Sequence, residues 1–339
     1  MIDGAAAIIR GKRDFLQVFV AGLLAGGHIL LEDNPGLGKT SLAKTIARLI
    51  GGMDGATAAG GGVVAADGGV GAGGCGPAAA DGGLLFKRIQ FTPDLLPYDI
   101  TGVDVFDPQS QKFRFAPGPV MANIVLADEI NRATPKVQSA LLEVMAERQV
   151  TVGQMSYTLP EPFVVLATQN TIESEGTFPL PAAQLDRFMM RLSIGYPDRE
   201  AEISVLNDNP GDRLLAGLKP VISVPDFLAA QNACAAVFCH DALKAAITDI
   251  ARETRSHKAV SLGASPRAGL HLLAAVKAFA WITGRAFVTD EDIAALAPSV
   301  LAHRLKLKDA HTRSPTDAAR TLIEEISRNV TGKVRGNTG

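Results

Sequence analysis

Short apolar runs alternate with segments of helical periodicity over the first 197 residues of this 339-residue chain. Between the runs, apolar residues recur three and four positions apart, as at Leu42, Ile46 and Leu49. Such alternation predicts an α/β domain whose parallel five-stranded sheet is covered by helices. The five predicted strands are short, mostly apolar runs of the kind expected for strands buried on both faces, and lie at 29–31, 85–91, 124–127, 163–167 and 190–194.

The pattern changes after Pro197, where strand-like runs fade and helical segments follow one another. The sequence therefore predicts an α/β core over residues 1–197, an all-helical domain over 198–330 and a flexible tail over 331–339. The helices expected in the second domain lie at about 198–206, 225–237, 241–255, 266–282 and 289–305.

Residues 51–83 have a different composition, with 14 glycines among 33 residues and no period of two or 3.6. This composition cannot offset the entropy lost on ordering, so it predicts a mobile loop inserted into the core. The loop lies between a helix and the next strand, and we expect it at the amino edge of the strands, away from the ligand crevice. A role in binding a partner is the alternative.

The formal net charge and the cysteine content limit the binding partners and the location that can be expected for this protein. The formal net charge of −2 provides no overall field for nucleic acid or an anionic membrane. Three cysteines cannot form a disulfide framework, which makes a reducing cytoplasm the expected location. Cys234, Cys239 and His240 invite a metal interpretation, but their spacing is not that of paired metal ligands, so buried core cysteines are expected. The apolar stretch 15–31 is interrupted by glutamine, glycine and histidine, and we expect no membrane span.

The segment LLEDNPGLGKTSLAK, residues 30–44, has the strand–turn–helix context of a phosphate-binding loop. Gly36 and Gly38 allow torsions that side chains forbid, and the amides of the loop and of the helix start then face an anion. Lys39 can reach the outer phosphates, and the Thr40 hydroxyl can bind Mg²⁺. The predicted nucleotide-binding residues are Asn34, Pro35, Gly36, Leu37, Gly38, Lys39, Thr40 and Ser41.

Asp33 stands where the usual phosphate-loop pattern has its first glycine. A carboxylate close to phosphates would repel them. We therefore predict that the Asp33 side chain points away from the loop and that nucleotide binding survives.

Two further strand ends carry candidate catalytic residues. The run NIVLADEINRA ends in Asp128 and Glu129, and FVVLATQN ends in Asn170. Asp128 can hold Mg²⁺ through water, and Glu129 is placed to orient or deprotonate an attacking water. The Asn170 amide can hold the same water from the other side.

Two arginines complete the candidate set. Arg187 precedes the last predicted strand, and Arg267 follows a predicted N-cap, Ser265, in the first turn of a helix. A cation at a helix N-terminus opposes the helix dipole, which suggests an external anion as its target. Ordinary surface arginines are the alternative for both residues.

Several long segments resemble the MoxR-type AAA+ ATPases: AGGHILLEDNPGLGKT, FKRIQFTPDLLPYDITG, LADEINRATPKVQSALLEVMAERQVT, FVVLATQNTIESEGTFPLPAAQLDRF and LGASPRAGLHLLAAVKA. The resemblance implies a AAA+ P-loop core with a helical lid, assembly into homo-oligomeric rings that are usually hexamers, and hydrolysis of ATP with Mg²⁺.

The same resemblance implies roles for the candidate residues. Lys39 and Thr40 match the Walker A positions, and Asp128 and Glu129 match Walker B. Asn170 corresponds to sensor 1, Arg267 to sensor 2 and Arg187 to the arginine finger. On this interpretation Arg187 acts on the nucleotide of a neighbouring subunit, whereas Arg267 links the lid to the γ-phosphate.

Partners also follow from the resemblance. Two predicted hairpins, 103–115 and 150–159, would project toward the ring centre and grip a client. The family implies a partner with a von Willebrand factor A domain, and a role in assembly or in metal or cofactor loading of a client enzyme. A nucleic-acid motor is one alternative, although the hairpins carry few basic residues. A nucleotide-dependent binding switch is the other.

Overall fold

The structure is a computed structural model that describes residues 1–34, 36–51, 84–170, 176–208, 211–308 and 315–336. Pro35 and nearly all of the glycine-rich segment 51–83 lie outside the described residues, and so does Cys75. The predictions made for them therefore remain predictions.

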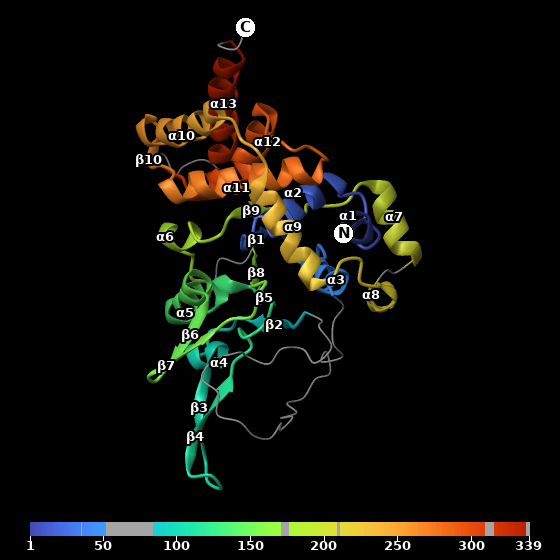
Figure 1. Ribbon diagram of the computed structural model, residues 1–339, viewed down its shortest axis with the longest axis vertical. Helices are drawn as coiled ribbons and strands as arrows, with labels where there is room; N and C mark the ends of the chain where they lie inside the picture. Colours follow the sequence, from blue (N-terminus) through green and yellow to red (C-terminus); the bar gives the residue numbers. More distant parts are fainter. Residues whose placement is uncertain (35, 52–83, 171–175, 209–210, 309–314, 337–339) are drawn as a thin grey trace.

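A five-stranded parallel sheet forms the centre of the α/β core (Figure 1). All five strands predicted from apolar runs are present. Those at 29–31, 124–127 and 163–167 are apolar and buried throughout, as strands covered on both faces are, whereas the edge strand at 85–91 has exposed Arg88 and Gln90. Helical crossovers separate strands that are consecutive in the chain, so the carboxyl ends of all five meet at one edge. The order across the sheet is β2 (Phe86–Gln90), β5 (Ile124–Asp128), β8 (Val164–Gln169), β1 (Ile29–Glu32) and β9 (Met190–Leu192).

Successive residues of each strand enter different cores. Ile29 and Leu31 of β1 pack on the side of α2 (Arg13–Leu24) and α3 (Lys39–Leu49). Leu30 faces the opposite side, where α5 covers the sheet. This alternation follows from the two-residue period of a strand. The remaining short elements of the core are α1 (Ile2–Ala6), α4 (Pro97–Thr101), η1 (Ile130–Arg132), α5 (Pro135–Glu147) and α6 (Ala182–Leu185).

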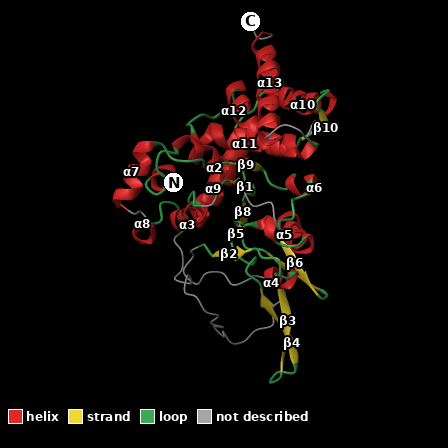
Figure 2. Ribbon diagram, turned by 180° about the vertical axis from the view of Figure 1, so that it is seen from behind, coloured by secondary structure: helices red, strands yellow, loops and turns green. Residues whose placement is uncertain are grey.

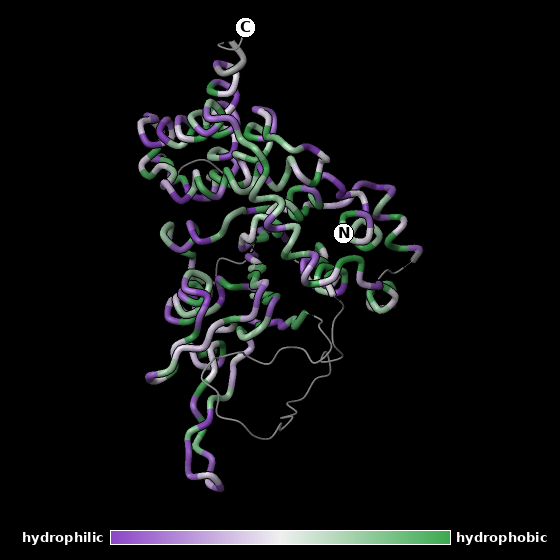
Figure 3. The backbone as a smooth tube through the Cα atoms, in the orientation of Figure 1, coloured by the Kyte–Doolittle hydropathy of each residue, from purple (hydrophilic) through white to green (hydrophobic). Residues whose placement is uncertain are grey.

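Both predicted hairpins are present, as β3 (Gly102–Asp107) with β4 (Lys112–Pro117) and as β6 (Gln149–Val152) with β7 (Met155–Thr158). Phe115 and Tyr157 stack across them with ring centroids 4.0 Å apart. The β3–β4 hairpin extends to the end of the molecule opposite the C-terminal helices (Figure 1). In Figure 3 this hairpin alternates between hydrophobic and hydrophilic colours, whereas the sheet is mostly hydrophobic.

Helices dominate the second domain, and those of its C-terminal part gather at one end of the molecule (Figure 2). All five helices predicted there are present, and α8 and α13 are additional. The helices are α7 (Arg199–Asp208), α8 (Gly211–Gly217), α9 (Val224–Ala236), α10 (Asp241–Ser256), α11 (Pro266–Ile282), α12 (Asp290–Leu301), η2 (Ala302–Arg304) and α13 (Pro315–Gly336).

Two features of this domain differ from the sequence prediction. A short antiparallel ribbon, β10 (Val260–Leu262) with β11 (Lys306–Leu307), interrupts the helices, so the domain is not all-helical. Helix α13 also continues to Gly336 through most of the segment predicted as a tail. Its residues Ile323, Ile326 and Val330 are buried in the same core as α10 and α12, which keeps the chain helical.

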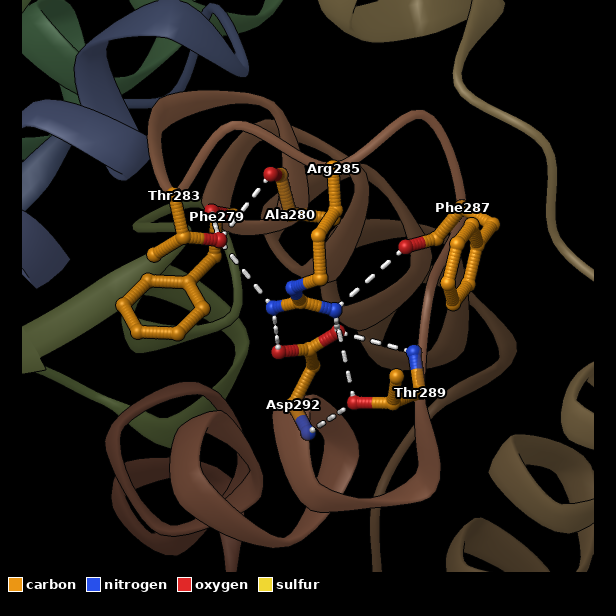
Figure 4. A network of polar contacts seen from close by, with 7 residues as sticks. All are labelled: Phe279, Ala280, Thr283, Arg285, Phe287, Thr289 and Asp292. Carbon is orange, nitrogen blue, oxygen red and sulfur yellow. Dashed lines mark hydrogen bonds and ion pairs between the residues drawn. The ribbon is translucent and has the colours of Figure 1, made fainter.

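The turn between α11 and α12 is fixed by a polar network (Figure 4). Arg285 donates to both carboxylate oxygens of Asp292, at 2.7 and 2.5 Å. Asp292 also accepts the Thr289 N–H, and the Thr289 hydroxyl caps α12. The helical domain packs on the core mainly through α11 against α2, and one continuous hydrophobic cluster joins them.

Candidate functional site

A cavity of about 360 Å³ opens at the carboxyl edge of the sheet. It brings together the phosphate loop, the Asp128–Glu129 strand end and Asn170, which are far apart in the sequence. The convergence of these strand ends matches the expectation for ligands of doubly wound sheets. The lining residues are Gly36, Leu37, Gly38, Lys39, Thr40, Ser41, Asp128, Glu129, Thr168 and Asn170.

The loop has the backbone that its glycines predict. Gly36 and Gly38 have φ values of +83° and +82°, in the left-handed region that favours glycine. Helix α3 begins at Lys39, so its first amides and its positive dipole end lie at the cavity. The Lys39 ammonium donates to the backbone carbonyls of Asp33 at 2.6 Å and Asn34 at 3.3 Å. Burial lowers the pKa of Lys39, and the carboxylates of Asp33, Asp128 and Glu129 partly oppose this shift.

Asp33 points away from the cavity, as predicted. Its carboxylate is only 5% exposed and accepts three hydrogen bonds from the end of β9. Oδ1 accepts the Ser193 hydroxyl at 2.6 Å and the Gly195 N–H at 3.0 Å, and Oδ2 accepts the Ile194 N–H at 2.7 Å. The residue that breaks the glycine pattern therefore joins the ends of β1 and β9.

Asp128 and Thr40 offer oxygen ligands of the kind that Mg²⁺ prefers. Asp128 is held in place, because its Oδ1 accepts the Thr168 hydroxyl at 2.6 Å and its Oδ2 accepts Arg88 Nη2 at 2.7 Å. With both oxygens engaged, Asp128 is better suited to hold Mg²⁺ through bound water than directly. The residues present therefore fit the ion.

Glu129 has a strained backbone and an engaged side chain. Its φ of +56° is rare for a residue other than glycine, and the Thr168 hydroxyl accepts its N–H at 2.8 Å. The Glu129 carboxylate accepts Gln90 Nε2 at 2.8 Å and Arg132 Nη1 at 3.1 Å. Such strain is typical of functional positions.

Sequence reasoning missed three residues of this site, namely Arg88, Gln90 and Thr168. Arg88 and Gln90 lie within the strand predicted at 85–91, which pairs with β5 in the structure. Only the strand order makes them neighbours of Asp128 and Glu129.

A second, mainly apolar cavity of about 220 Å³ adjoins the first and shares Gly36, Leu37, Gly38 and Ser41 with it. Ile8 and Ile9 from the N-terminal segment face Ile194 and Val205 across it. Its apolar walls suit a flat aromatic group such as a nucleobase. No local pattern in the sequence pointed to these residues, because three distant segments form the cavity.

Arg187 and Arg267 line a third cavity, of about 280 Å³, together with Arg148, His28 and His271. None of the residues that line this cavity carries a carboxylate. The cavity lies at the amino edge of the sheet, since His28 directly precedes β1. The structure thus brings the two predicted arginines together, but it does not place Arg267 at the phosphate cavity of its own chain.

The two histidines of this cavity contribute little positive charge. Burial lowers the pKa of His28 to about 4 and that of His271 to about 3. Arg304 and Arg267 lower the pKa of His271 further. His28 Nδ1 accepts the Val165 N–H at 3.0 Å, so its ring proton is on Nε2. The charge of the cavity therefore comes from its arginines.

Cys234 and Cys239 are buried free thiols, and burial raises the pKa of both. Within the described part of the chain, no cluster of histidine, cysteine or acidic residues could hold a metal ion. No helix there is long and apolar enough to cross a membrane.

Comparisons with known proteins agree with this geometry. The family described as "ATPase family associated with various cellular activities (AAA)" matches residues 78–190, and "AAA lid domain" matches residues 252–326. The protein YeaC of Bacillus subtilis, described as uncharacterized, is 44% identical over 88% of this chain and 84% of its own length. "Chaperone MoxR1" of Mycobacterium tuberculosis is 39% identical over 88% of this chain and 73% of its own. The crystal structure of a putative ATPase from Cytophaga hutchinsonii has 35% identity and a TM-score of 0.79, covering 96% of this chain and 92% of its own.

Proposed function

This chain belongs to the MoxR-type AAA+ ATPases, and we propose that it couples Mg²⁺-dependent ATP hydrolysis in a homo-oligomeric ring to the remodelling of a protein client. The observation that carries the proposal is the cavity in which Lys39, Thr40, Asp128, Glu129 and Asn170 meet. Each supplies a group that cleavage of a phosphoanhydride bond requires.

Within one chain, the loop amides and Lys39 bind the phosphates, while Thr40 and Asp128 would hold Mg²⁺. Bound Mg²⁺ neutralises charge that develops on the phosphate oxygens. Glu129 orients the attacking water and accepts its proton, and Asn170 holds that water from the other side. The apolar cavity beside the loop receives the base.

The positive charge for the transition state comes from the next subunit. From His28 to Asp33, five residue steps along β1 span roughly 16 Å at about 3.3 Å per residue. The arginine cavity therefore lies too far from Lys39 to share one phosphate with it. In a closed ring of head-to-tail contacts, Arg187, Arg267 and Arg148 face the neighbour's nucleotide. An arginine finger in this role accelerates hydrolysis by roughly 10³–10⁵.

The β3–β4 and β6–β7 hairpins contact the client. Phe106, Phe113 and Met155 are exposed on them, and Phe113 is 72% exposed. These apolar side chains suit an unfolded or partly folded protein segment better than a nucleic-acid backbone, which binds cations. We extend the proposal to a hexameric ring in the cytoplasm, a partner with a von Willebrand factor A domain, and assembly or metal loading of a client enzyme.

Three variants test the proposal. Glu129→Gln should bind ATP but hardly hydrolyse it, and Lys39→Ala should lose ATP affinity. Lys44→Ala, on the same helix but outside the lining of the cavity, is the matched control and should retain both properties. Brisk hydrolysis by Glu129→Gln would refute the role of Glu129. Unchanged affinity in Lys39→Ala would refute the phosphate loop.

Mixed rings test the action between subunits. Arg187→Ala subunits keep a complete phosphate cavity, and Glu129→Gln subunits keep the arginines. Mixing the two inactive variants should restore hydrolysis, and failure at every ratio counts against the ring arrangement.

Salt-sensitive DNA binding that stimulates hydrolysis would favour the nucleic-acid motor instead. Absence of turnover with client present would favour the binding switch.

A further inference from the structure

A half-buried polar cluster, centred on the buried Arg304, lies next to the two predicted arginines in the chain. Asp186 precedes Arg187 in the chain, and Ser265 lies two residues before Arg267. The Ser265 hydroxyl is 2.9 and 3.1 Å from the two carboxylate oxygens of Asp186, to which it donates. Ser265 is also the N-cap of α11 and accepts the Ala268 N–H at 3.2 Å. One hydroxyl therefore joins the segment that carries Arg187 to the helix that carries Arg267.

Arg304, the last residue of η2, contacts both the segment that carries Arg187 and the helix that carries Arg267. It is 3% exposed, and its Nε forms an ion pair with Asp186 Oδ1 at 3.1 Å. Its Nη2 donates to the Phe188 carbonyl at 2.7 Å and to His271 Nδ1 at 2.6 Å. Phe188 directly follows Arg187 in the chain. Arg304 thus contacts the residues on both sides of Arg187 and a residue on α11.

These contacts matter because secondary structure alone does not fix the position of Arg187 relative to Arg267. Arg187 lies on a turn between α6 and β9, and Arg267 lies on the lid. His271 is one helical turn beyond Arg267, so its contact with Arg304 fixes the rotation of α11. In an ion pair with one buried partner, such as Arg304–Asp186, desolvation offsets much of the attraction, so we expect it to contribute more to one specific arrangement than to net stability.

We propose that Asp186, Ser265 and Arg304 form a positioning clamp that sets the spacing of Arg187 and Arg267 at the neighbouring subunit's nucleotide. This inference rests on the proposed function, in which both arginines act between subunits. The three clamp residues line neither the phosphate cavity nor the arginine cavity. Because a misplacement of about 1 Å can cost roughly 10²-fold in rate, loosening the clamp lowers kcat and leaves KM for ATP nearly unchanged.

Ser265→Ala tests the clamp, and Ser223→Ala is its matched control. Ser223 is the N-cap of α9 and likewise accepts the N–H three residues later at 3.2 Å, but it donates only to its own helix's Asp226. Both variants lose one cap bond, and only Ser265→Ala loses the link to Asp186. We expect Ser265→Ala to lower kcat about tenfold or more, by the positioning argument above. Both variants should unfold at similar temperatures, and Ser265→Thr should restore the rate.

Subunit mixing separates positioning from folding. Ser265→Ala subunits keep a complete phosphate cavity, and Glu129→Gln subunits keep an intact clamp. In a mixed ring some sites combine the two, and ATP hydrolysis should therefore rise. A folding defect within the variant chain would not be repaired in this way. If Ser265→Ala lowers kcat no more than Ser223→Ala does, the clamp is refuted. If the mixture of Ser265→Ala with Glu129→Gln shows no rescue while the mixture of Arg187→Ala with Glu129→Gln is rescued, the clamp alone is refuted. If neither mixture is rescued, the ring mechanism fails and the clamp with it.

Discussion

Replacing Asp33 by glycine restores the usual glycine spacing of a phosphate loop, yet we expect it to destabilise the protein. Asp33 is buried and accepts the Ile194 N–H, the Gly195 N–H and the Ser193 hydroxyl. Ser193 is exposed and can turn to water, whereas the Ile194 N–H is buried. Removing the carboxylate leaves the Ile194 N–H unsatisfied and the partly buried Gly195 N–H only partly satisfied.

The magnitude follows from these contacts. An unsatisfied buried group costs about 1–3 kcal/mol, and hydrogen bonds to a charged group contribute roughly 1.5–3 kcal/mol. The added glycine costs about 0.5–1 kcal/mol more in backbone freedom. We expect Asp33→Gly to lower the free energy of unfolding by roughly 2–5 kcal/mol. At about 2–4 °C per kcal/mol for a domain of this size, Tm should fall by roughly 4–20 °C.

Thermal unfolding and ATP titration of three variants check this prediction. Asp33→Asn keeps one acceptor oxygen and should lose less stability than Asp33→Gly. Asp249→Asn, an exposed position in α10, should change little. Because the Asp33 carboxylate does not line the phosphate cavity, Asp33→Asn should bind ATP nearly as the parent does. An Asp33→Gly variant as stable as the parent would refute the structural role, and much tighter ATP binding by Asp33→Asn would show that the carboxylate repels phosphate.

Three shorter predictions concern the arginine cavity, the buried histidine and the catalytic glutamate. Arg148→Ala should lower kcat about tenfold or more, which is less than the roughly 10³–10⁵-fold effect of losing an arginine finger. Mixing with Glu129→Gln subunits should restore hydrolysis, whereas a normal rate in Arg148→Ala alone would show that Arg148 does not act at the site. Burial lowers the pKa of His28 to about 4, so between pH 6.5 and 4 the unfolded chain binds a proton that the folded chain does not. Stability therefore falls as pH drops through that window, and the loss of Tm between pH 7.5 and 5 should be smaller in His28→Gln. Gln90→Ala frees the Glu129 carboxylate from one hydrogen bond and should raise basal ATP turnover severalfold, whereas lower turnover would show that Gln90 holds Glu129 in its working position.

The sequence predicted those features that depend on adjacent residues. The three central strands could be found because a parallel strand buried on both faces is apolar throughout, and the two edge strands kept enough apolar residues to be recognised despite Arg88, Gln90 and Arg191. The phosphate loop could be found because its amides, Lys39 and Thr40 are consecutive in the chain. Arg88, Gln90 and Thr168 were missed because they reach Asp128 and Glu129 only through the strand order.

The location of Arg267 shows why long-range packing could not be predicted. Its place in the first turn of α11 was predicted from Ser265 and Pro266 and is confirmed. Its partner cavity depends on the packing of α11 against α2, between segments more than 240 positions apart, which no local pattern encodes. The expectation that Arg267 links the lid to its own chain's phosphate is therefore not met in this structure.

The separation of charge across the sheet means that the proposed mechanism requires a second subunit. At the carboxyl edge, Lys39 lines the phosphate cavity together with Asp128 and Glu129, whereas Arg88 and Arg132 pair with those two carboxylates and do not line the cavity. The amino edge has three arginines in a cavity that no carboxylate lines. A phosphate bound to one chain gains that positive charge only when the amino edge of another chain faces it. Assembly and catalysis are then the same event, and a lone subunit should bind ATP without hydrolysing it at an appreciable rate. Dilution below the assembly concentration should therefore lower turnover per subunit steeply while ATP affinity changes little, and turnover independent of concentration in a proven monomer would contradict this argument.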